Sequence, residues 1–238
     1  MLQVAIHSNS RLMGNKAAQG GALHAEGYAN ITISSSLVAG NSAASGAALL
    51  VASEAQLVLS NSAIKRNSAE KNGAGLLLQG NTSAAIAGAS FSNNTALMYG
   101  SAVVADSQTK VQLVNCSFSN NTAERGTVLV TNSAAVAISH SAFHSNNASR
   151  AGTTVLYVVQ SNFTHNNATN GAGVNIMDRA IANISHCSFL FNNASTGGGL
   201  YAEGNAVFDI SGCNITSNRV SSTGGGVFLS QSAIVSLS

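Results

Sequence analysis

The sequence is short of charge: Asp, Glu, Lys and Arg make up 8% of its 238 residues, against about a quarter in an ordinary soluble domain. The formal net charge is +2, so the chain lacks the basic surface that binds nucleic acid, and we expect no nucleic-acid partner. Proline and tryptophan are absent. Disordered chains are rich in charge or proline and lack a regular apolar pattern, so this composition does not indicate disorder.

Long hydrophobic runs are also missing. The longest, such as AALLVA at residues 47–52, fall far short of a bilayer-spanning segment of about 20 apolar residues. We therefore expect no transmembrane segment in this chain. The first fifteen residues, MLQVAIHSNSRLMGN, lack the basic start and the apolar stretch of a signal peptide.

An internal repeat takes the place of these features. A hydrophobic-x-x-Asn phrase recurs nine times, with its Asn at Asn15, Asn41, Asn67, Asn94, Asn121, Asn146, Asn166, Asn192 and Asn218. Successive Asn residues are 26, 26, 27, 27, 25, 20, 26 and 26 positions apart. A period of this length is typical of solenoid proteins.

Residues at equal distances from the repeated Asn share their character. Three positions before it stand Leu12, Val38, Ile64, Phe91, Phe118, Phe143, Phe163, Phe189 and Ile215. Five positions before it the residue is small: Ser10, Ser36, Ser62, Ala89, Cys116, Ser141, Ser161, Cys187 and Cys213. Glycine-marked segments follow it, among them GGAL at 20–23, GAGV at 171–174 and GGGL at 197–200.

Within each repeat the apolar residues alternate with a period of two. NITIS (30–34), AQLVLS (55–60) and KVQLV (110–114) read as half-buried strands. We predict an all-β fold: a right-handed parallel β-helix of about nine coils of roughly 26 residues, with about three short strands in each coil and no evident caps.

Stacked coils bring equivalent side chains into register about 4.8 Å apart. We therefore predict an interior stack of Phe91, Phe118, Phe143, Phe163, Phe189 and Ile215. We also predict that the nine repeated Asn residues form a ladder of amide hydrogen bonds along the axis.

The interval between Asn146 and Asn166 lacks about six residues. We expect an irregular short coil around 147–166, with the missing residues between GTTVL (152–156) and YVVQSNF (157–163). The whole of 1–238 reads as a single β-helix domain. Because both ends fall partway through a coil, we expect it to be a segment of a longer chain.

The combination of GGA[L/V]-type segments with F-x-x-N phrases resembles the repeats of the polymorphic outer membrane proteins, which are autotransporter adhesins. The array is more loosely similar to the pectin-lyase-like β-helix superfamily. The resemblance covers the whole chain and implies an extracellular or cell-surface, outer-membrane location and an adhesive role. The chain departs from that family in lacking a signal peptide and the C-terminal membrane barrel.

Candidate catalytic residues are few and scattered. Asp106, Asp178 and Asp209 are the only Asp residues. Asp106 and Asp178 share a repeat position three coils apart, which is about 14 Å and too far for paired catalytic carboxylates. His144 and His165 fall on adjacent coils without a carboxylate or thiolate beside them, so we expect no metal site. No glycine run matches a phosphate-binding loop, and we expect no cofactor.

Cysteines and asparagines leave alternatives open. Cys116, Cys187 and Cys213 share one repeat position, which favours buried thiols over a Cys187–Cys213 disulfide because stacked side chains point the same way. Eleven Asn-x-Ser/Thr sequons occur. Of these, we expect the acceptors beside the repeated Asn to point outward as candidate glycosylation sites: Asn93, Asn120, Asn147, Asn167 and Asn193.

Two functions from different classes fit these features. The first is a non-enzymatic extracellular or cell-surface segment that serves as an adhesive or structural stalk. Its expected partners are a host or cell-surface receptor, matrix or cell-wall polysaccharide. The alternative is part of a carbohydrate-binding or polysaccharide-degrading protein whose active coils lie outside this segment. A spacer without a ligand is a third reading.

Overall fold

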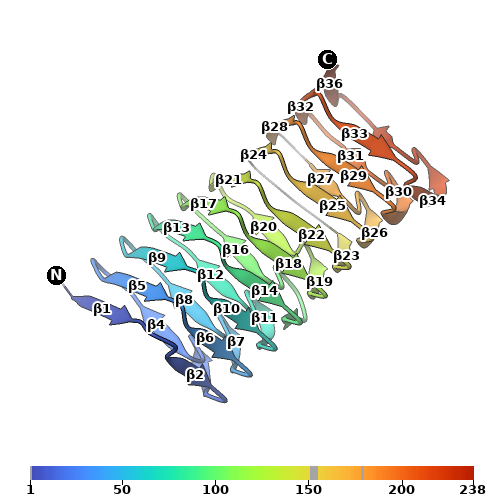
Figure 1. Cartoon of the computed structure of the whole chain (residues 1–238). Coiled ribbons are helices and arrows are strands. Elements are labelled where there is room, and N and C mark those ends of the chain that lie inside the picture. Colours follow the sequence, from blue (N-terminus) through green and yellow to red (C-terminus); the bar gives the residue numbers. More distant parts are fainter. Residues whose placement is uncertain (1, 151–154, 178–179) are drawn as a thin grey trace.

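The computed structural model describes residues 2–150, 155–177 and 180–238. Within these residues the chain winds into a rod of stacked coils, with the N-terminus at one end and the C-terminus at the other (Figure 1). All the secondary structure described is β-strand, and all the strand pairings are parallel between one coil and the next. The predicted parallel β-helix with coils of about 26 residues is confirmed.

Sheet A runs the full length of the rod. Its members are β1 (Gln3–Ile6), β5 (Asn30–Ser34), β9 (Gln56–Ser60), β13 (Ser83–Ala87), β17 (Lys110–Val114), β21 (Ala135–Ser139), β24 (Val155–Val159), β28 (Ile181–Ser185), β32 (Val207–Ser211) and β36 (Ile234–Leu237). Alternate residues of these strands point inward, as the period of two predicts. Ile33, for example, is buried and lies in register with Leu59.

Sheet B holds the residue that precedes each repeated Asn by three. Its strands are β2 (Arg11–Met13), β6 (Leu37–Ala39), β10 (Ala63–Lys65), β14 (Ser90–Ser92), β18 (Ser117–Ser119), β22 (Ala142–His144), β25 (Asn162–Thr164), β29 (Ser188–Leu190) and β33 (Asn214–Thr216). The central residue of each strand points into the core.

Sheet C begins directly after the repeated Asn. It contains β3 (Lys16–Gln19), β7 (Ser42–Ser45), β11 (Ser68–Asn72), β15 (Thr95–Ala96), β19 (Thr122–Arg125), β23 (Asn147–Arg150), β26 (Asn167–Asn170), β30 (Asn193–Thr196) and β34 (Arg219–Thr223). On its inner side a small Ala cluster, which includes Ala43, Ala69 and Ala96, is buried.

The fourth face follows the glycines and is divided into two sheets. Sheet D contains β4 (Leu23–Ala25), β8 (Leu49–Val51), β12 (Leu76–Leu78), β16 (Val103–Ala105) and β20 (Val128–Val130). Sheet E contains β27 (Val174–Ile176), β31 (Leu200–Ala202) and β35 (Val227–Leu229).

A regular coil therefore has four strands, and the prediction of about three was wrong in this detail. The hydrophobic-x-x-Asn phrase was interpreted as a single corner. In the structure Phe91 lies within β14 and Thr95 already begins β15, so that the corner is only Asn93 and Asn94. The chain turns this sharply because Asn93 adopts a left-handed backbone conformation, with φ of +54°.

The glycines between sheets C and D serve a second sharp turn. Gly73 has φ of +63°, and a Cβ atom on it would lie 2.7 Å from the carbonyl oxygen of Leu76. This turn brings the outward-pointing residues of sheet D under cover. Leu50, Leu77, Val104 and Leu129 form a second apolar cluster there and are each at most 5% exposed.

The short coil interrupts the fourth face. Between β20 and β27 the described residues contain no strand on this face, whereas sheets A, B and C continue through β24, β22–β25 and β23–β26. A short coil was predicted around 147–166, with the missing residues between 152–156 and 157–163. That finer placement was wrong, because Leu156 and Tyr157 are consecutive residues of β24 and lie in register with Val136 and Ala137 of β21. Residues 151–154 lie outside the described residues.

In the part of the chain that the structure describes, no helix is long and apolar enough to cross a membrane.

Candidate functional site

The repeated Asn residues form an inner amide ladder at the corner between sheets B and C. Each Nδ2 donates to the Oδ1 of the next Asn along the rod, at 3.0–3.1 Å, from Asn15 through to Asn218. The backbone N–H of each of the first eight Asn residues donates to the same Oδ1, at 2.9–3.1 Å. The ladder thus binds every coil to its neighbour.

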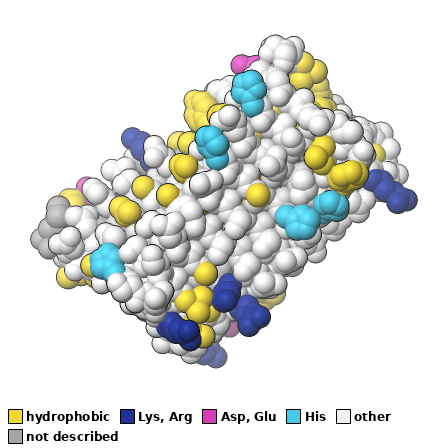
Figure 2. Space-filling view, viewed as in Figure 1, with side chains coloured by type: hydrophobic (Ala, Val, Ile, Leu, Met, Phe, Trp, Pro, Cys, Tyr) yellow, Lys and Arg dark blue, Asp and Glu magenta, His cyan; other side chains and the backbone are white. Residues whose placement is uncertain are grey.

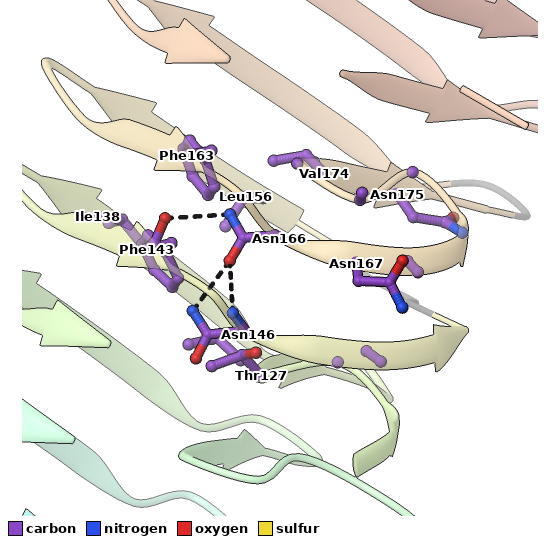
Figure 3. A pocket seen from close by; sticks show the side chains of 17 residues that line it. Thr127, Ile138, Phe143, Asn146, Leu156, Phe163, Asn166, Asn167, Val174 and Asn175 are labelled. Atoms are coloured by element: carbon purple, nitrogen blue, oxygen red, sulfur yellow. Dashed lines mark hydrogen bonds between the residues drawn. The ribbon is translucent and has the colours of Figure 1, made fainter. Parts of the chain in front are cut away.

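From Asn41 to Asn218 each ladder amide also donates from Nδ2 to a backbone carbonyl oxygen. Asn166 Nδ2, for example, donates to the carbonyl oxygen of Phe143 at 3.0 Å, while Asn166 Oδ1 accepts from Asn146 (Figure 3). The six central Asn residues between Asn41 and Asn166, together with Asn192, are at most 4% exposed. Buried amides with this many hydrogen bonds hold the coils together and have little capacity left for a ligand.

The five predicted phenylalanines stack directly beneath the ladder. Successive ring centroids lie 4.4–5.0 Å apart and the ring planes differ by 6–10°. Ile215 continues the column, because it lies in register with Phe189. All five rings are at most 5% exposed, so the stack belongs to the core.

A ladder of serines and cysteines lies at the corner between sheets A and B. It was not predicted from the sequence. The backbone N–H of Ser36 donates to Ser62 Oγ at 3.1 Å, and that of Ser141 donates to Ser161 Oγ at 3.1 Å. Cys187 N–H donates in the same way to Cys213 Sγ at 3.3 Å. The small residues were assigned only to a tight corner, but their side chains also accept a hydrogen bond from the preceding coil.

The three cysteines occupy this ladder as free thiols. Cys116 and Cys187 are buried, and Cys213 is partly buried. Burial raises the pKa of Cys116 and raises the pKa of Cys187 to about 11. Of the two alternatives left open by the sequence, the structure has the buried thiols and not the disulfide.

A cavity of about 70 Å³ lies beside the short coil, between residues of β20 and β27 (Figure 3). Apolar side chains make up most of its wall, among them Ile138, Phe143, Leu156 and Phe163. The amides at its edge include Asn146 and Asn166, which are already bound in the inner ladder. A cavity of this size holds a few water molecules at most, and this wall offers no reactive group.

A second, outer amide ladder crosses the exposed face of sheet C. Asn167 Nδ2 donates to Asn147 Oδ1 at 3.0 Å, and Asn193 Nδ2 donates to Asn167 Oδ1 at 2.9 Å. All three side chains are exposed. Together with the hydroxyls of Thr169, Ser195 and Ser221 they line a shallow groove of about 290 Å³. We call this surface the amide groove.

An aromatic corner adjoins the amide groove. His165 and Phe191 stack with ring centroids 5.3 Å apart and planes inclined by 25°. His144 meets His165 edge-on at 5.2 Å, and its Nδ1 lies 2.9 Å from Thr164 Oγ1. On the face seen in Figure 2, histidine side chains adjoin one another beside hydrophobic side chains. The expected proximity of His144 and His165 is thus observed.

On the face seen in Figure 2 most of the surface is uncharged, and several Lys and Arg side chains gather along the lower edge. No group of three His, Cys, Asp or Glu residues that could hold a metal ion occurs among the described residues. Asp106 caps a turn, because its Oδ1 accepts from the Ser107 N–H at 2.7 Å, Thr131 Oγ1 at 3.0 Å and Asn132 Nδ2 at 2.7 Å. Asp209 is exposed on sheet A. Asp178 lies outside the described residues.

The five sequon acceptors are exposed, but they fall into two structural positions. Asn93 and Asn120 stand before the inner ladder in left-handed corners, both with φ of +54°. Asn147, Asn167 and Asn193 follow it and form the outer amide ladder. The sequence signal for that ladder was present, since the three share one repeat position, but it was interpreted as a set of glycosylation sites.

A family described as the right handed beta helix region matches residues 3–155 and 74–237. These matches cover nearly the whole sequence, and the chain therefore belongs to the right-handed β-helix family. The comparisons with curated proteins and with solved structures gave no match. The family defines the fold and assigns no reaction to it.

Proposed function

We propose that this chain is a non-enzymatic, extracellular or cell-surface β-helix segment that serves as an adhesive or structural stalk. The observation that carries the proposal is that the inward-facing side chains of the described residues stack the coils and form no reactive site. Inward-facing amides, hydroxyls, thiols and rings are committed to stacking one coil on the next, as in the ladder from Asn15 to Asn218. Such a rod resists bending and can hold a binding surface away from its point of attachment.

The resemblance to polymorphic outer membrane protein repeats supports this role through its two motifs. The glycine of the GGA-type segments turns the chain into the fourth face, as at Gly197 with φ of +63°. The F-x-x-N phrase supplies one stacked ring and one ladder amide to each coil, as Phe163 and Asn166 do. We propose that the chain is built from repeats of this type and acts at the cell surface, with a receptor, matrix component or cell-wall polysaccharide as its partner.

The alternative function is to bind or to degrade carbohydrate. One observation favours carbohydrate binding. The amide groove is exposed, uncharged and bordered by aromatic rings. Degradation would need paired carboxylates. Asp106 is instead engaged in a turn, and Asp209 lies on a different face from the groove.

The test is to incubate the purified chain with matrix-coated surfaces, cultured cells and a panel of polysaccharides, and to measure both attachment and release of new sugar ends. We expect saturable attachment without turnover. Turnover that disappears in the variants Asp106→Asn or Asp209→Asn would contradict the non-enzymatic assignment, and absence of attachment to every surface would contradict the adhesive one.

A further inference from the structure

The aromatic corner is held in a backbone conformation that bulky residues avoid. Phe191 has φ of +55°, and so does His165 beside it. A left-handed conformation is unfavourable for an L-residue other than Asn or Asp. In the same column Gly14, Gly40, Asn93 and Asn120 tolerate this conformation, and Arg66, Ser145 and Ser217 also adopt it. The left-handed corner therefore belongs to the fold, and only the aromatic rings are particular to these two coils.

The rings at this corner are not used by the core. Phe191 is 55% exposed, whereas the stacked Phe189 two residues earlier is 0% exposed. Its only ring partner among the described residues is His165. Phe191, His165 and His144 therefore form an exposed aromatic ridge that spans three successive coils at the edge of sheet C.

The amide groove lies immediately beyond the ridge, because Asn167 and Asn193 follow His165 and Phe191 by two residues. A side-chain amide has two N–H donors and an oxygen with two lone pairs. The outer ladder uses one N–H each of Asn167 and Asn193 and one lone pair each of Asn147 and Asn167. Donors and acceptors consequently remain on every coil of the groove, and the hydroxyls of Thr169, Ser195 and Ser221 adjoin them.

Charge narrows the class of ligand. None of the described residues that line the groove is charged. The nearest charge along the Asn column is Arg219, which lies in register with Asn193 at one end of the groove. A ligand that carries hydroxyls in place of charges, and that has apolar C–H faces to lie on aromatic rings, matches this surface.

The spacing of the site favours a chain-like ligand. Equivalent groups repeat about every 4.8 Å along the rod, which is close to the length of one hexose unit in an extended oligosaccharide. Each coil can therefore present an amide and a hydroxyl to one sugar unit. The ridge can stack against the face of a ring at the same time.

We propose that the amide groove and the aromatic ridge together bind a neutral oligosaccharide that lies along the rod axis, with Phe191 and His165 as the stacking platform and Asn147, Asn167 and Asn193 as hydrogen-bonding groups. This proposal rests on the proposed function and names the ligand class through which the stalk adheres.

The test uses the whole chain, produced in a host that does not glycosylate it, so that Asn147, Asn167 and Asn193 stay unmodified. Binding is screened on immobilised neutral oligosaccharides and on a matched set containing uronic acids, and the best ligand is measured by calorimetry at increasing chain length. The variants are Phe191→Asn and Asn167→Ala. Tyr157→Asn, which removes a ring that is 47% exposed on sheet A, is the matched control.

We expect neutral oligosaccharides to bind more tightly as the chain lengthens up to three or four units. Phe191→Asn should weaken binding about tenfold, as the loss of one aromatic contact implies, while its melting temperature stays equal or rises because Asn tolerates the left-handed corner. Asn167→Ala should also weaken binding, and Tyr157→Asn should leave it unchanged.

Three results would overturn the proposal. The first is binding of uronic-acid ligands alone. The second is an equal loss of oligosaccharide affinity in Phe191→Asn and Tyr157→Asn. The third is attachment that survives enzymatic removal of glycans from the target surface, which indicates a protein partner. If the wild-type chain attaches to cells or matrix and Phe191→Asn attaches equally well, the glycan site is wrong and the adhesive function stands. If the wild type attaches nowhere, the proposed function itself fails.

Discussion

The ring of Phe118 lies on the ring of Phe143 with centroids 4.4 Å apart and planes inclined by only 8°. Nearly parallel stacking at this distance follows from the coil spacing, because residues in register present their rings one above the next. The geometry makes each ring part of the packing surface of the next coil. The contribution of one phenylalanine therefore extends to the coils on both sides.

The variant Phe143→Ala should lower the free energy of unfolding by about 3–5 kcal/mol, because it removes a buried ring and leaves a cavity between Phe118 and Phe163. Urea unfolding of the purified chain measures the loss. Phe191→Ala is the matched control: that ring is 55% exposed, and its removal should cost well under 1 kcal/mol. Equal losses in the two variants would show that the stack does not carry the core.

The inner ladder should be as sensitive as the stack. Asn94 Oδ1 accepts from Asn67, and its Nδ2 donates to Asn121 Oδ1 and to the carbonyl of Ile64. In Asn94→Ala each of these buried partners loses a hydrogen bond, at about 1–3 kcal/mol for a group left unsatisfied. We expect a total loss of several kcal/mol, measured by thermal and urea unfolding.

Asn93→Gly is the control for that experiment. Asn93 is exposed and stands in the same corner with φ of +54°, a conformation that glycine adopts without strain. Its replacement should change stability by less than about 0.5 kcal/mol. If the two variants lose similar amounts, the ladder amide contributes no more to stability than the exposed Asn93 side chain beside it.

The sequence predicted the features that repeat with the coil, since a residue and its equivalents occupy one column. Phe118 and Asn121 could be placed in the core from their spacing alone. The division of a coil into four strands was not predicted, because a corner of two residues such as Asn93–Asn94 leaves no break in the pattern. Nor was the burial of Leu50 and Leu77, since three consecutive apolar residues in a short strand do not show that both faces are covered.

The candidate site was harder to predict for a different reason. The ridge depends on which exposed side chains of neighbouring coils meet, as His165 and Phe191 do, and their residue types differ from coil to coil. The shared repeat position of Asn147, Asn167 and Asn193 was visible in the sequence. These residues were interpreted as glycosylation acceptors and not as a hydrogen-bonded ladder. The short interval before Asn166 was visible too, yet only the structure shows that Leu156 lies in register with Val136 of the preceding coil.

The glycine turn into the fourth face supplies a third prediction. In Gly73→Ala the new methyl group would lie 2.7 Å from the carbonyl oxygen of Leu76 and 2.8 Å from Leu77 Cβ, in addition to the cost of a left-handed alanine. Gly14→Ala has a similar backbone, with φ of +67°, but meets nothing within 4 Å. We expect Gly73→Ala to lose at least about 1 kcal/mol more than Gly14→Ala in urea unfolding. Equal losses would assign the glycine requirement to backbone strain alone.

The buried thiol of Cys187 should make stability depend on alkaline pH. Burial, with a smaller contribution from neighbouring Cys213, raises its pKa from 9.0 to about 11. Between these values the unfolded chain releases a proton that the folded chain retains. Below about pH 9 this thiol therefore makes its full contribution to the free energy of unfolding, which is no more than about 3 kcal/mol. That contribution is lost as the pH rises towards 11. Cys187→Ser, with the residue that Ser161 supplies at the same position, should unfold with a flatter pH dependence. The other groups whose pKa burial raises, Cys116 and Tyr201, are present in both proteins. Parallel pH profiles from pH 8 to 11 would mean that Cys187 ionises as freely in the folded rod as in the unfolded chain.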